Sequence, residues 1–259
     1  MNEPMPASFA LTGQRVLVVG GTRGIGRAIA LEFARAGAEV IVNFVRERGP
    51  AEQLCELARQ EGSRIEAIRA DVSSDTARAE LLSAVFARFA DLSTLVFAAA
   101  TGVHKPFGAL TGRHFDFTYA LNVKAFLGLV QGVAPRMPPG GSIIALSSEG
   151  AEHAMHHYGL VGSSKAALES LCRHLAVELG PQGLRVNVLS PGTVLTEAWK
   201  SMPDAESRLA ASAARAATGR LVTPEEVAAS ARFLASRAAS GVSGHVLVVD
   251  GGARIRGAG

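Results

Sequence analysis

Residues 15–30 constrain the fold of this chain more than any other segment, because they read RVLVVGGTRGIGRAIA. Residues 16–19 are valine and leucine, a composition typical of a strand that is buried on both faces. A glycine-rich turn follows, and a helical pattern then continues through Ala34. A strand, a glycine-rich turn and a helix in this order form half of a βαβ unit that binds dinucleotides. The turn contains Gly20, Gly21, Gly24 and Gly26.

The glycines serve the turn in two ways. The turn is too tight for a Cβ atom, and a bare backbone lets a pyrophosphate approach the free N–H groups at the helix N-terminus. Their spacing is G-x-x-x-G-x-G. A tight turn that binds nothing is the alternative interpretation, but the strand before the glycines and the helix after them favour a dinucleotide site.

The length is compatible with one large α/β domain over residues 1–259 or with two small ones, with residues 1–14 as a lead-in. With 48% hydrophobic and 19% charged residues, the chain is globular rather than disordered. Its net charge of +3 includes no run of Lys or Arg, so nucleic acid is not an expected partner. Cys55 and Cys172 indicate no disulfide, and His104 and His153 lack the spacing of a metal site. No secretory leader or 18-residue apolar run is evident, which predicts a cytoplasmic protein without a membrane partner.

Further strands and helices alternate along the chain. Their short connections predict an α/β fold with a right-handed, doubly wound parallel sheet of about seven strands and helices on both faces. Ligands in such sheets bind beyond the carboxyl ends of the strands. After the first strand, the predicted strands are residues 39–44, 64–69, 92–98, 142–146, 184–189 and 246–249. The predicted helices after the first are residues 50–61, 75–89, 110–137, a helix from residue 159 onward, and 224–236.

The end of the second strand bears on the choice of cofactor. An acid at that point holds the adenosine ribose hydroxyls in dinucleotide-binding folds, but this strand runs into Asn43, Phe44, Val45 and Arg46. Arg23 in the glycine turn and Arg46 are instead suited to a 2′-phosphate, by charge and by planar hydrogen bonding. The pattern favours NADPH, although both arginines are also compatible with an ordinary solvated surface.

Several short motifs beyond the glycine turn are informative when taken together. They are Asp71-Val72, Asn122, Ser147-Ser148, Tyr158 with Lys165, Pro191-Gly192 and the closing residues 249–252. With these motifs the chain resembles the short-chain dehydrogenase/reductase family over essentially its full length. The resemblance implies a single Rossmann-like domain, a nicotinamide cofactor and a homotetramer. The cofactor contacts predicted from the turn and from the resemblance are Gly20, Thr22, Arg23, Gly24, Ile25, Gly26, Asn43, Arg46, Asp71, Val72, Ala98, Ala99, Lys165, Pro191, Gly192, Val194 and Thr196.

The spacing between Tyr158 and Lys165 departs from the usual pattern of this family. A tyrosine usually stands four residues before the lysine, one helical turn away, and that position is Val161 here. Tyr158 stands seven residues before Lys165, about two turns, so both side chains are expected to point into one cleft. Gly159 and Gly162 predict an irregular start to the helix, which would let the Tyr158 side chain reach further into the cleft. The Tyr-x6-Lys spacing resembles the enoyl-acyl-carrier-protein reductases within the family.

Enoyl reduction is chemically consistent with a displaced tyrosine. Hydride arrives two carbons from the thioester carbonyl, whose oxygen becomes an enolate, so the donor must lie further from the nicotinamide C4 than in a ketoreductase. Tyr158, protonated near neutrality, is expected to hydrogen-bond that oxygen. Lys165 is expected to hold the nicotinamide ribose and to add positive potential. Ser148 is expected to be a second contact to substrate, with a plain turn hydroxyl as the alternative. The resemblance assigns Asn122 to orienting Lys165 through water.

A helical segment over residues 195–220 resembles the substrate lid of the family, with Trp199 and Met202 suited to an acyl chain. The sequence therefore predicts an NADPH-dependent oxidoreductase that reduces the 2,3 double bond of an enoyl thioester. The thioester is carried by an acyl carrier protein or by CoA, in a fatty-acid or specialised-metabolite pathway. Two alternatives stay open. One is a ketoreductase or alcohol dehydrogenase that uses Tyr158 on a β-ketoacyl or polyketide-type carbonyl, and the other is a non-catalytic NADP-binding protein.

Overall fold

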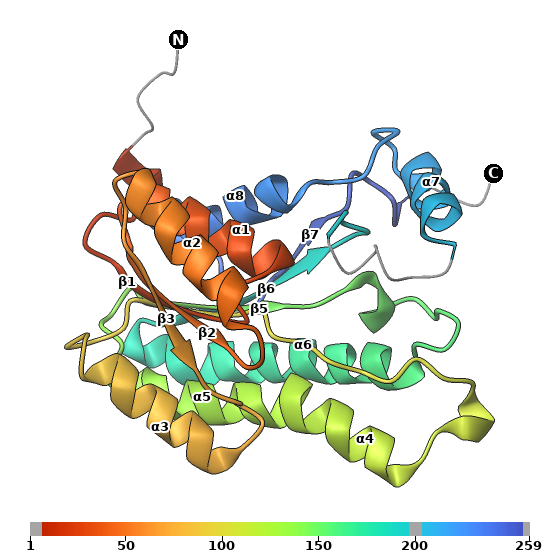
Figure 1. The fold of residues 1–259 in the computed structure, drawn as a ribbon, viewed down its shortest axis with the longest axis horizontal. Coiled ribbons are helices and arrows are strands. Elements are labelled where there is room, and N and C mark those ends of the chain that lie inside the picture. Colours follow the sequence, from red (N-terminus) through yellow and green to blue (C-terminus); the bar gives the residue numbers. More distant parts are fainter. Residues whose placement is uncertain (1–6, 197–203, 256–259) are drawn as a thin grey trace.

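A parallel β-sheet forms the centre of the structure, which is a computed structural model describing residues 7–196 and 204–255. The described residues form seven strands in the order β3-β2-β1-β4-β5-β6-β7 (Figure 1). The chain runs outward from β1 to β3 and then returns to β4 beside β1, which makes the β1–β4 border the topological switch point where such sheets bind ligands. The predicted doubly wound sheet is confirmed. Its strands are β1 (Arg15–Val19), β2 (Glu39–Phe44), β3 (Ile65–Arg69), β4 (Thr94–Phe97), β5 (Ser142–Leu146), β6 (Arg185–Pro191) and β7 (Val246–Val249).

Helices cover both faces of the sheet (Figure 1). One layer contains α1 (Gly24–Arg35), α2 (Arg48–Gln60) and α8 (Pro224–Ala235). The other contains α3 (Asp75–Phe86), α5 (Phe126–Val133) and α6 (Gly159–Leu179), and α4 (Gly112–Tyr119) leads into α5. A further helix, α7 (Ala205–Arg215), lies apart from these layers. No helix in the described ranges has both the length and the apolar character needed to cross a membrane.

Alternate residues of β1 enter two separate hydrophobic clusters. Val16 and Val18 belong to the cluster under α1 and α8, whereas Leu17 and Val19 belong to the cluster under α5 and α6. All four side chains are fully buried. Because side chains alternate across a strand, a strand covered on both faces must be apolar throughout. This is the physical reason for the uninterrupted apolar run that precedes the glycine turn.

The helical region predicted for residues 110–137 is not one continuous helix. It consists of α4, a π-helical stretch at Ala120–Ala125, α5 and a 3-10 turn at Ala134–Arg136. The π-helical stretch carries the fully buried Asn122, and such stretches often occur at functional sites. The sequence pattern missed the interruption because an inserted residue leaves the helix propensity of its neighbours unchanged.

Two peripheral segments complete the description. The predicted lead-in is partly integrated into the fold, since Leu11 is fully buried and the Phe9 ring lies 6.3 Å from that of Phe233 in α8. α7 forms a helix within the predicted lid. The lid residues Trp199 and Met202 lie outside the described residues.

Candidate active site and cofactor cleft

The glycine turn lies tightly against the end of β4. Gly20 has a φ of +78°, and a Cβ added to it would lie 2.8 Å from the backbone of Ala99. A Cβ on Gly26 would overlap the carbonyl oxygen of Gly20. Ala98 continues the ladder beyond β4, because its N–H donates to the carbonyl of Val19 at 2.9 Å. The structure thus brings together the predicted contacts Gly20, Gly26, Ala98 and Ala99 at the switch point.

The start of α1 fits the diphosphate of a dinucleotide. Arg23 occupies the N-cap in an extended conformation, and its guanidinium bonds Glu47 rather than the helix end. Gly24 has a φ of +52° and faces Thr196, whose methyl group would be 3.5 Å from an added Cβ. The two segments border a cavity of about 800 Å³. A glycine backbone at a helix N-terminus is an established anion site, so the residues present fit the cofactor that the glycine turn implies. The cavity is lined among others by Thr22, Arg23, Gly24, Leu195, Thr196 and Leu209.

Two further predicted cofactor contacts, Asn43 and Asp71, form hydrogen bonds within the fold itself. The buried Asn43 amide donates to the carbonyl of Ala70 at 2.9 Å, tying β2 to the chain after β3. The backbone oxygen of Asn43 accepts from the N–H groups of Gly20 and Gly21 at 3.2 and 3.3 Å. Asp71 accepts from the backbone and the hydroxyl of Ser73 at 3.0 and 2.6 Å. A cofactor contact of the Asn43 and Asp71 side chains stays a prediction.

The remaining predicted cofactor contacts lie around the same cleft. Val72 is buried in the cluster under α5 and α6, and Ile25 packs at the edge of the opposite cluster. Pro191 ends β6, and Gly192 donates to the carbonyl of Val249 at 2.9 Å. These residues are held by the fold at the carboxyl ends of the strands. Val194 pairs with Val222 in an isolated bridge.

The end of β2 is rich in arginine. Arg46 lines a cavity of about 490 Å³ together with Arg48 and Arg69. Arg23 forms an ion pair with Glu47 at 3.0 Å, and both side chains are more than half exposed. Glu47 is the first acid after β2. The sequence analysis missed it because it considered only residues 43–46 at the end of this strand. Glu47 therefore pairs with one of the two arginines that were predicted to meet a 2′-phosphate.

The structure brings Ser148 and Tyr158 within hydrogen-bonding distance. Ser148 follows β5, Tyr158 is the N-cap of α6, and their hydroxyl oxygens are 3.2 Å apart. A Cβ on Gly150 would overlap the Tyr158 ring, and one on Gly162 would overlap the carbonyl of Gly150. Gly150 and Gly162 therefore allow the segment after β5 to lie directly on the start of α6. The irregular helix start expected from Gly159 and Gly162 is wrong, because α6 is helical from Gly159 onward and Gly162 serves this close packing.

Lys165 is buried on α6. Its Nζ donates to the carbonyl of Leu146, at the end of β5, at 2.7 Å. Burial lowers the pKa of Lys165 from 10.5 to about 8, and the nearby Cys172 and Glu169 oppose this change. The ammonium group is costly to bury, which indicates that the fold holds it there for a purpose other than stability.

Asn122 contacts the neighbour of the lysine. Its amide donates to the carbonyl of Thr101 at 2.8 Å and to the hydroxyl of Ser164 at 2.9 Å. Its oxygen accepts from the N–H of Thr101 at 2.9 Å. The side chain therefore joins the π-helical stretch, the segment after β4 and α6. Orientation of Lys165 through water stays a prediction from the resemblance.

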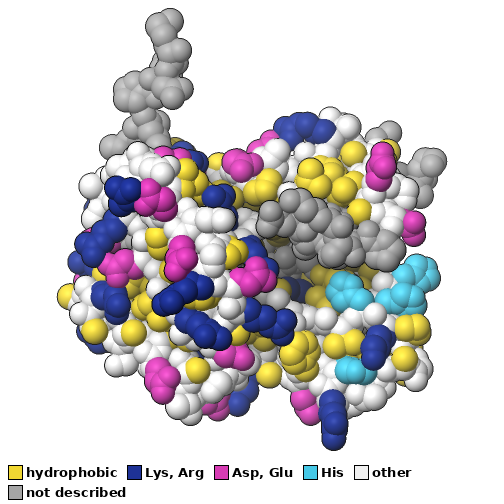
Figure 2. Space-filling view, in the orientation of Figure 1, with side chains coloured by type: hydrophobic (Ala, Val, Ile, Leu, Met, Phe, Trp, Pro, Cys, Tyr) yellow, Lys and Arg dark blue, Asp and Glu magenta, His cyan; other side chains and the backbone are white. Residues whose placement is uncertain are grey.

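His104 is a neighbour of the site to which the sequence analysis gave no role, having only noted that it lacks the spacing of a metal ligand. Its ring lies 5.3 Å from the Tyr158 ring in an edge-on arrangement. Burial, and secondarily the positive charge of Arg208 on α7, lower the pKa of His104 below its ordinary value. Histidine side chains gather on the face between α7 and α4 in Figure 2. A spacing rule in the sequence does not reveal this contact, because His104 and Tyr158 are brought together by two separate strands.

Comparison with known protein families agrees with the dinucleotide-binding fold described above. A family model described as enoyl-(acyl carrier protein) reductase matches residues 19–254. The chain belongs to the short-chain dehydrogenase/reductase family. The matched range includes the glycine turn after Val19, Ser148, Tyr158 and Lys165. The chain is accordingly an oxidoreductase that binds a nicotinamide dinucleotide.

Similar short-chain dehydrogenases/reductases act on diverse molecules, as their names state. The chain is 34% identical to 1-cyclohexenylcarbonyl-CoA reductase of Streptomyces collinus, over 98% of this chain and 92% of that protein. It is 36% identical to 7alpha-hydroxysteroid dehydrogenase of Escherichia coli, over 95% and 96%. A solved 7alpha-hydroxysteroid dehydrogenase with NADH and 7-oxo glycochenodeoxycholic acid has a TM-score of 0.88 at 35% identity, covering 95% of this chain and 96% of that chain. A short-chain dehydrogenase of Burkholderia cenocepacia with NADP has a TM-score of 0.87 at 31% identity, covering 94% and 99%.

Proposed function

We propose that this short-chain dehydrogenase/reductase uses NADPH to reduce the 2,3 double bond of an enoyl thioester. The observation that carries the proposal is the position of the phenol. Tyr158 precedes α6 and lies 3.2 Å from Ser148, whereas the position one turn before Lys165 is the buried Val161. The name of the Streptomyces collinus relative, a reductase of an unsaturated acyl-CoA, is consistent with this chemistry.

The reaction adds a hydride at C3 of the substrate and a proton, taken from solvent water, at C2. The bound nicotinamide supplies the hydride. Negative charge then develops on the thioester oxygen, and Tyr158 and Ser148 donate hydrogen bonds to that oxygen. Donors that are already aimed at a developing oxyanion stabilise the transition state without reorganisation. Lys165 binds the nicotinamide ribose and keeps positive charge near the same oxygen.

The cleft has features suited to the cofactor and to an acyl substrate. Arg23, Arg46 and the neighbouring arginines of the 490 Å³ cavity favour the extra phosphate of NADPH. The segment over residues 195–220, which includes α7, acts as a lid over the acyl chain. An acyl carrier protein or CoA is the carrier.

A homotetramer is part of the proposal. The family builds its oligomers on the helices that follow strands 4 and 5, which correspond to α4, α5 and α6 here. α4 exposes the aromatic side chains of Phe115 and Phe117, which are 46% and 53% exposed. Exposed aromatic side chains on one helix are typical of a contact surface.

Carbonyl reduction is the second candidate. It is favoured by the direct contact between the Ser148 and Tyr158 hydroxyls, which is also suited to donating a proton to a ketone oxygen. The relative from Escherichia coli is named as a hydroxysteroid dehydrogenase, which agrees with this candidate. In carbonyl reduction, the hydride and the proton are delivered to the carbon and the oxygen of one C=O bond. In enoyl reduction they are delivered to C3 and C2 of the C=C bond.

A direct comparison of substrates tests the proposal. NADPH oxidation is measured with a trans-2-enoyl thioester and with a β-ketoacyl thioester of the same chain length, on the native protein and on Tyr158→Phe. We expect faster oxidation with the enoyl thioester, and its loss in the variant. Preferential use of the β-ketoacyl thioester would support the second candidate. NADPH binding without turnover of any thioester or ketone would instead support a non-catalytic protein.

A further inference from the structure

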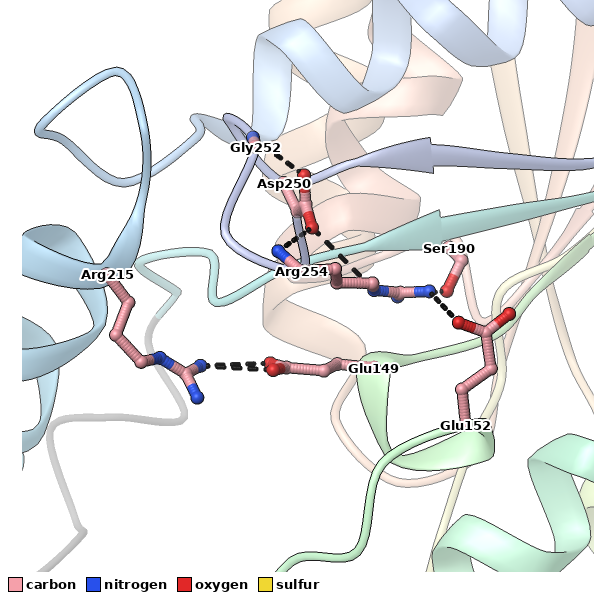
Figure 3. Close-up of polar contacts among 7 residues, drawn as sticks. All are labelled: Glu149, Glu152, Ser190, Arg215, Asp250, Gly252 and Arg254. Atoms are coloured by element: carbon pink, nitrogen blue, oxygen red, sulfur yellow. Dashed lines mark hydrogen bonds and ion pairs between the residues drawn. The ribbon is translucent and has the colours of Figure 1, made fainter. Parts of the chain in front are cut away.

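Two arginines from distant parts of the chain hold the Ser148 turn, which we define as residues 148–152 (Figure 3). Arg215, the last residue of α7, pairs with Glu149 at 3.1 Å, and its side chain is 55% exposed. Arg254, beyond β7, pairs with Glu152 at 3.3 Å, and its side chain is only 6% exposed. Exposed ion pairs contribute little to rigidity, because water and salt screen them. The guanidinium of Arg254 is buried, although its partner Glu152 is 49% exposed, so Arg254 is the more rigidly held of the two anchors.

Arg254 also reaches the end of β6. Its Nη2 donates to the hydroxyl of Ser190 at 2.6 Å, and its backbone N–H donates to Asp250 at 3.0 Å. The same Asp250 carboxylate lies 3.7 Å from Nε. Ser190 is fully buried and directly precedes Pro191. Asp250 also packs against Gly192, where an added Cβ would lie 2.7 Å from its side chain.

The restraint passes from Glu152 to Ser148 through a tight backbone turn. The N–H of Ala151 donates to the carbonyl of Ser148 at 3.0 Å, and the N–H of Glu152 donates to that of Glu149 at 3.2 Å. Gly150, in the middle of the turn, lies against the Tyr158 ring. A displacement at Glu152 therefore moves both the Ser148 hydroxyl and the surface on which Tyr158 rests.

We infer that Arg254 is a positioning residue, which fixes the Ser148 turn against the end of β6 and so aligns the Ser148–Tyr158 pair with Pro191 and Gly192, two of the predicted cofactor contacts. The inference rests on the proposed role of Ser148 and Tyr158 at the substrate oxygen. A planar guanidinium with several fixed donors suits this task, because it bonds Ser190 and Glu152 in one geometry. Small displacements of reacting groups have large effects on rate.

A double-mutant cycle separates positioning from general stability. Arg254→Ala is made in the native protein and in Ser148→Ala, and kcat is measured with whichever thioester or ketone the native protein reduces. We expect Arg254→Ala to lower kcat by about tenfold or more in the native background. In the Ser148→Ala background the loss should be clearly smaller, because coupled residues are not additive, and the loss that remains acts through Tyr158. Arg254→Lys should recover part of the loss, since it keeps the charge but not the planar fork.

Arg185 provides a matched control. It is a buried arginine at the opposite end of β6, where it donates to the carbonyls of Leu234 at 2.7 Å and Val242 at 3.3 Å. Arg185→Ala should lower the melting temperature, as Arg254→Ala is also expected to do, but should change kcat by less than about twofold in both backgrounds. If Arg254→Ala does not fold, Glu152→Gln replaces it in the cycle, because it weakens the same contact without emptying the buried space.

Hydrogen exchange gives a second readout that does not depend on turnover. In the cofactor-free protein, the amides of Ala151 and Glu152 should exchange faster in Arg254→Ala and in Glu152→Gln than in the native protein or Arg185→Ala. Unchanged exchange of these amides, or an equal loss of kcat in both backgrounds, would overturn the inference. Full activity of Ser148→Ala would overturn the proposed role of Ser148, while the exchange data would still decide whether Arg254 anchors the turn.

Discussion

The side chain of Val161 packs directly on the backbone of Gly102, so closely that a Cβ at Gly102 would overlap it. Val161 is 5% exposed, and Gly102 follows Thr101, which is held by Asn122. The position one turn before Lys165 is therefore a packing position between α6 and the segment after β4. The phenol of Tyr158, one turn earlier, is the one that meets Ser148.

Tyr158→Phe is expected to lower kcat while leaving NADPH affinity nearly unchanged. The substitution keeps the ring that lies on Gly150 and removes the hydroxyl 3.2 Å from Ser148. Loss of one preorganised donor typically costs a hundredfold to a thousandfold in rate, or about 3–4 kcal/mol. Steady-state kinetics and an NADPH titration check the two parts. Near-full activity on every substrate tried would show that Tyr158 does not contact the reacting oxygen.

Moving the phenol to the conventional position is not expected to restore enoyl reduction. In the double variant Val161→Tyr with Tyr158→Phe, the new ring must displace the segment at Gly102, and such overpacking costs about 1–3 kcal/mol of stability. Thermal unfolding measures this cost, and turnover of the enoyl thioester measures the function. Recovery of native turnover by the double variant would contradict the placement of the donor.

NADPH is expected to bind more tightly than NADH. Arg23→Ala and Arg46→Ala should weaken NADPH binding much more than NADH binding, because NADPH alone carries the 2′-phosphate. Glu47→Gln should act in the opposite direction, since Glu47 holds Arg23 in an ion pair at 3.0 Å in the cofactor-free chain. Calorimetric titration of both cofactors against each variant provides the measurement. Equal or tighter binding of NADH by the native protein would rule out the preference.

Lys165 is expected to make the cofactor-free protein less stable at neutral pH than in mild alkali. Its pKa is about 8 in the folded chain, against 10.5 in its ordinary range, because burial disfavours the ammonium. Between these two values the unfolded chain binds the extra proton, so the free energy of unfolding rises with pH across this window. Lys165→Met should flatten this rise and stabilise the protein at pH 7 by up to about 3 kcal/mol.

Urea unfolding of native and Lys165→Met protein at several pH values between 7 and about 10.5 tests the titration. The comparison isolates Lys165, because other groups titrate alike in both proteins. The same substitution should raise the dissociation constant of NADPH, since Lys165 is proposed to hold the ribose. Identical pH slopes in the two proteins would contradict the shifted pKa of the lysine.

Local patterns predicted the sheet and its helices well. The apolar run at residues 16–19 and the glycines after it are strong signals, because a doubly covered strand and a tight phosphate turn each tolerate few residue types. The π-helical stretch at Ala120–Ala125 was not predictable, since its residues are ordinary helix formers. The burial of Leu11 was also missed, because its packing partners lie far away in the sequence.

The candidate site, like the fold, was predicted in part from local motifs and decided in part by tertiary contacts. The sequence by itself determined the family, the strand-end positions of Ser148 and the glycine turn, and the unusual spacing of Tyr158 and Lys165, because all of these are properties of short motifs. Only the tertiary structure decided that the Val161 side chain packs on Gly102, that Gly150 supports Tyr158, and that Glu47 pairs with Arg23. It also decided that Arg254 reaches Glu152, 102 residues away. These relationships depend on which backbones come close and which charges are buried, and chain distance carries no information about either.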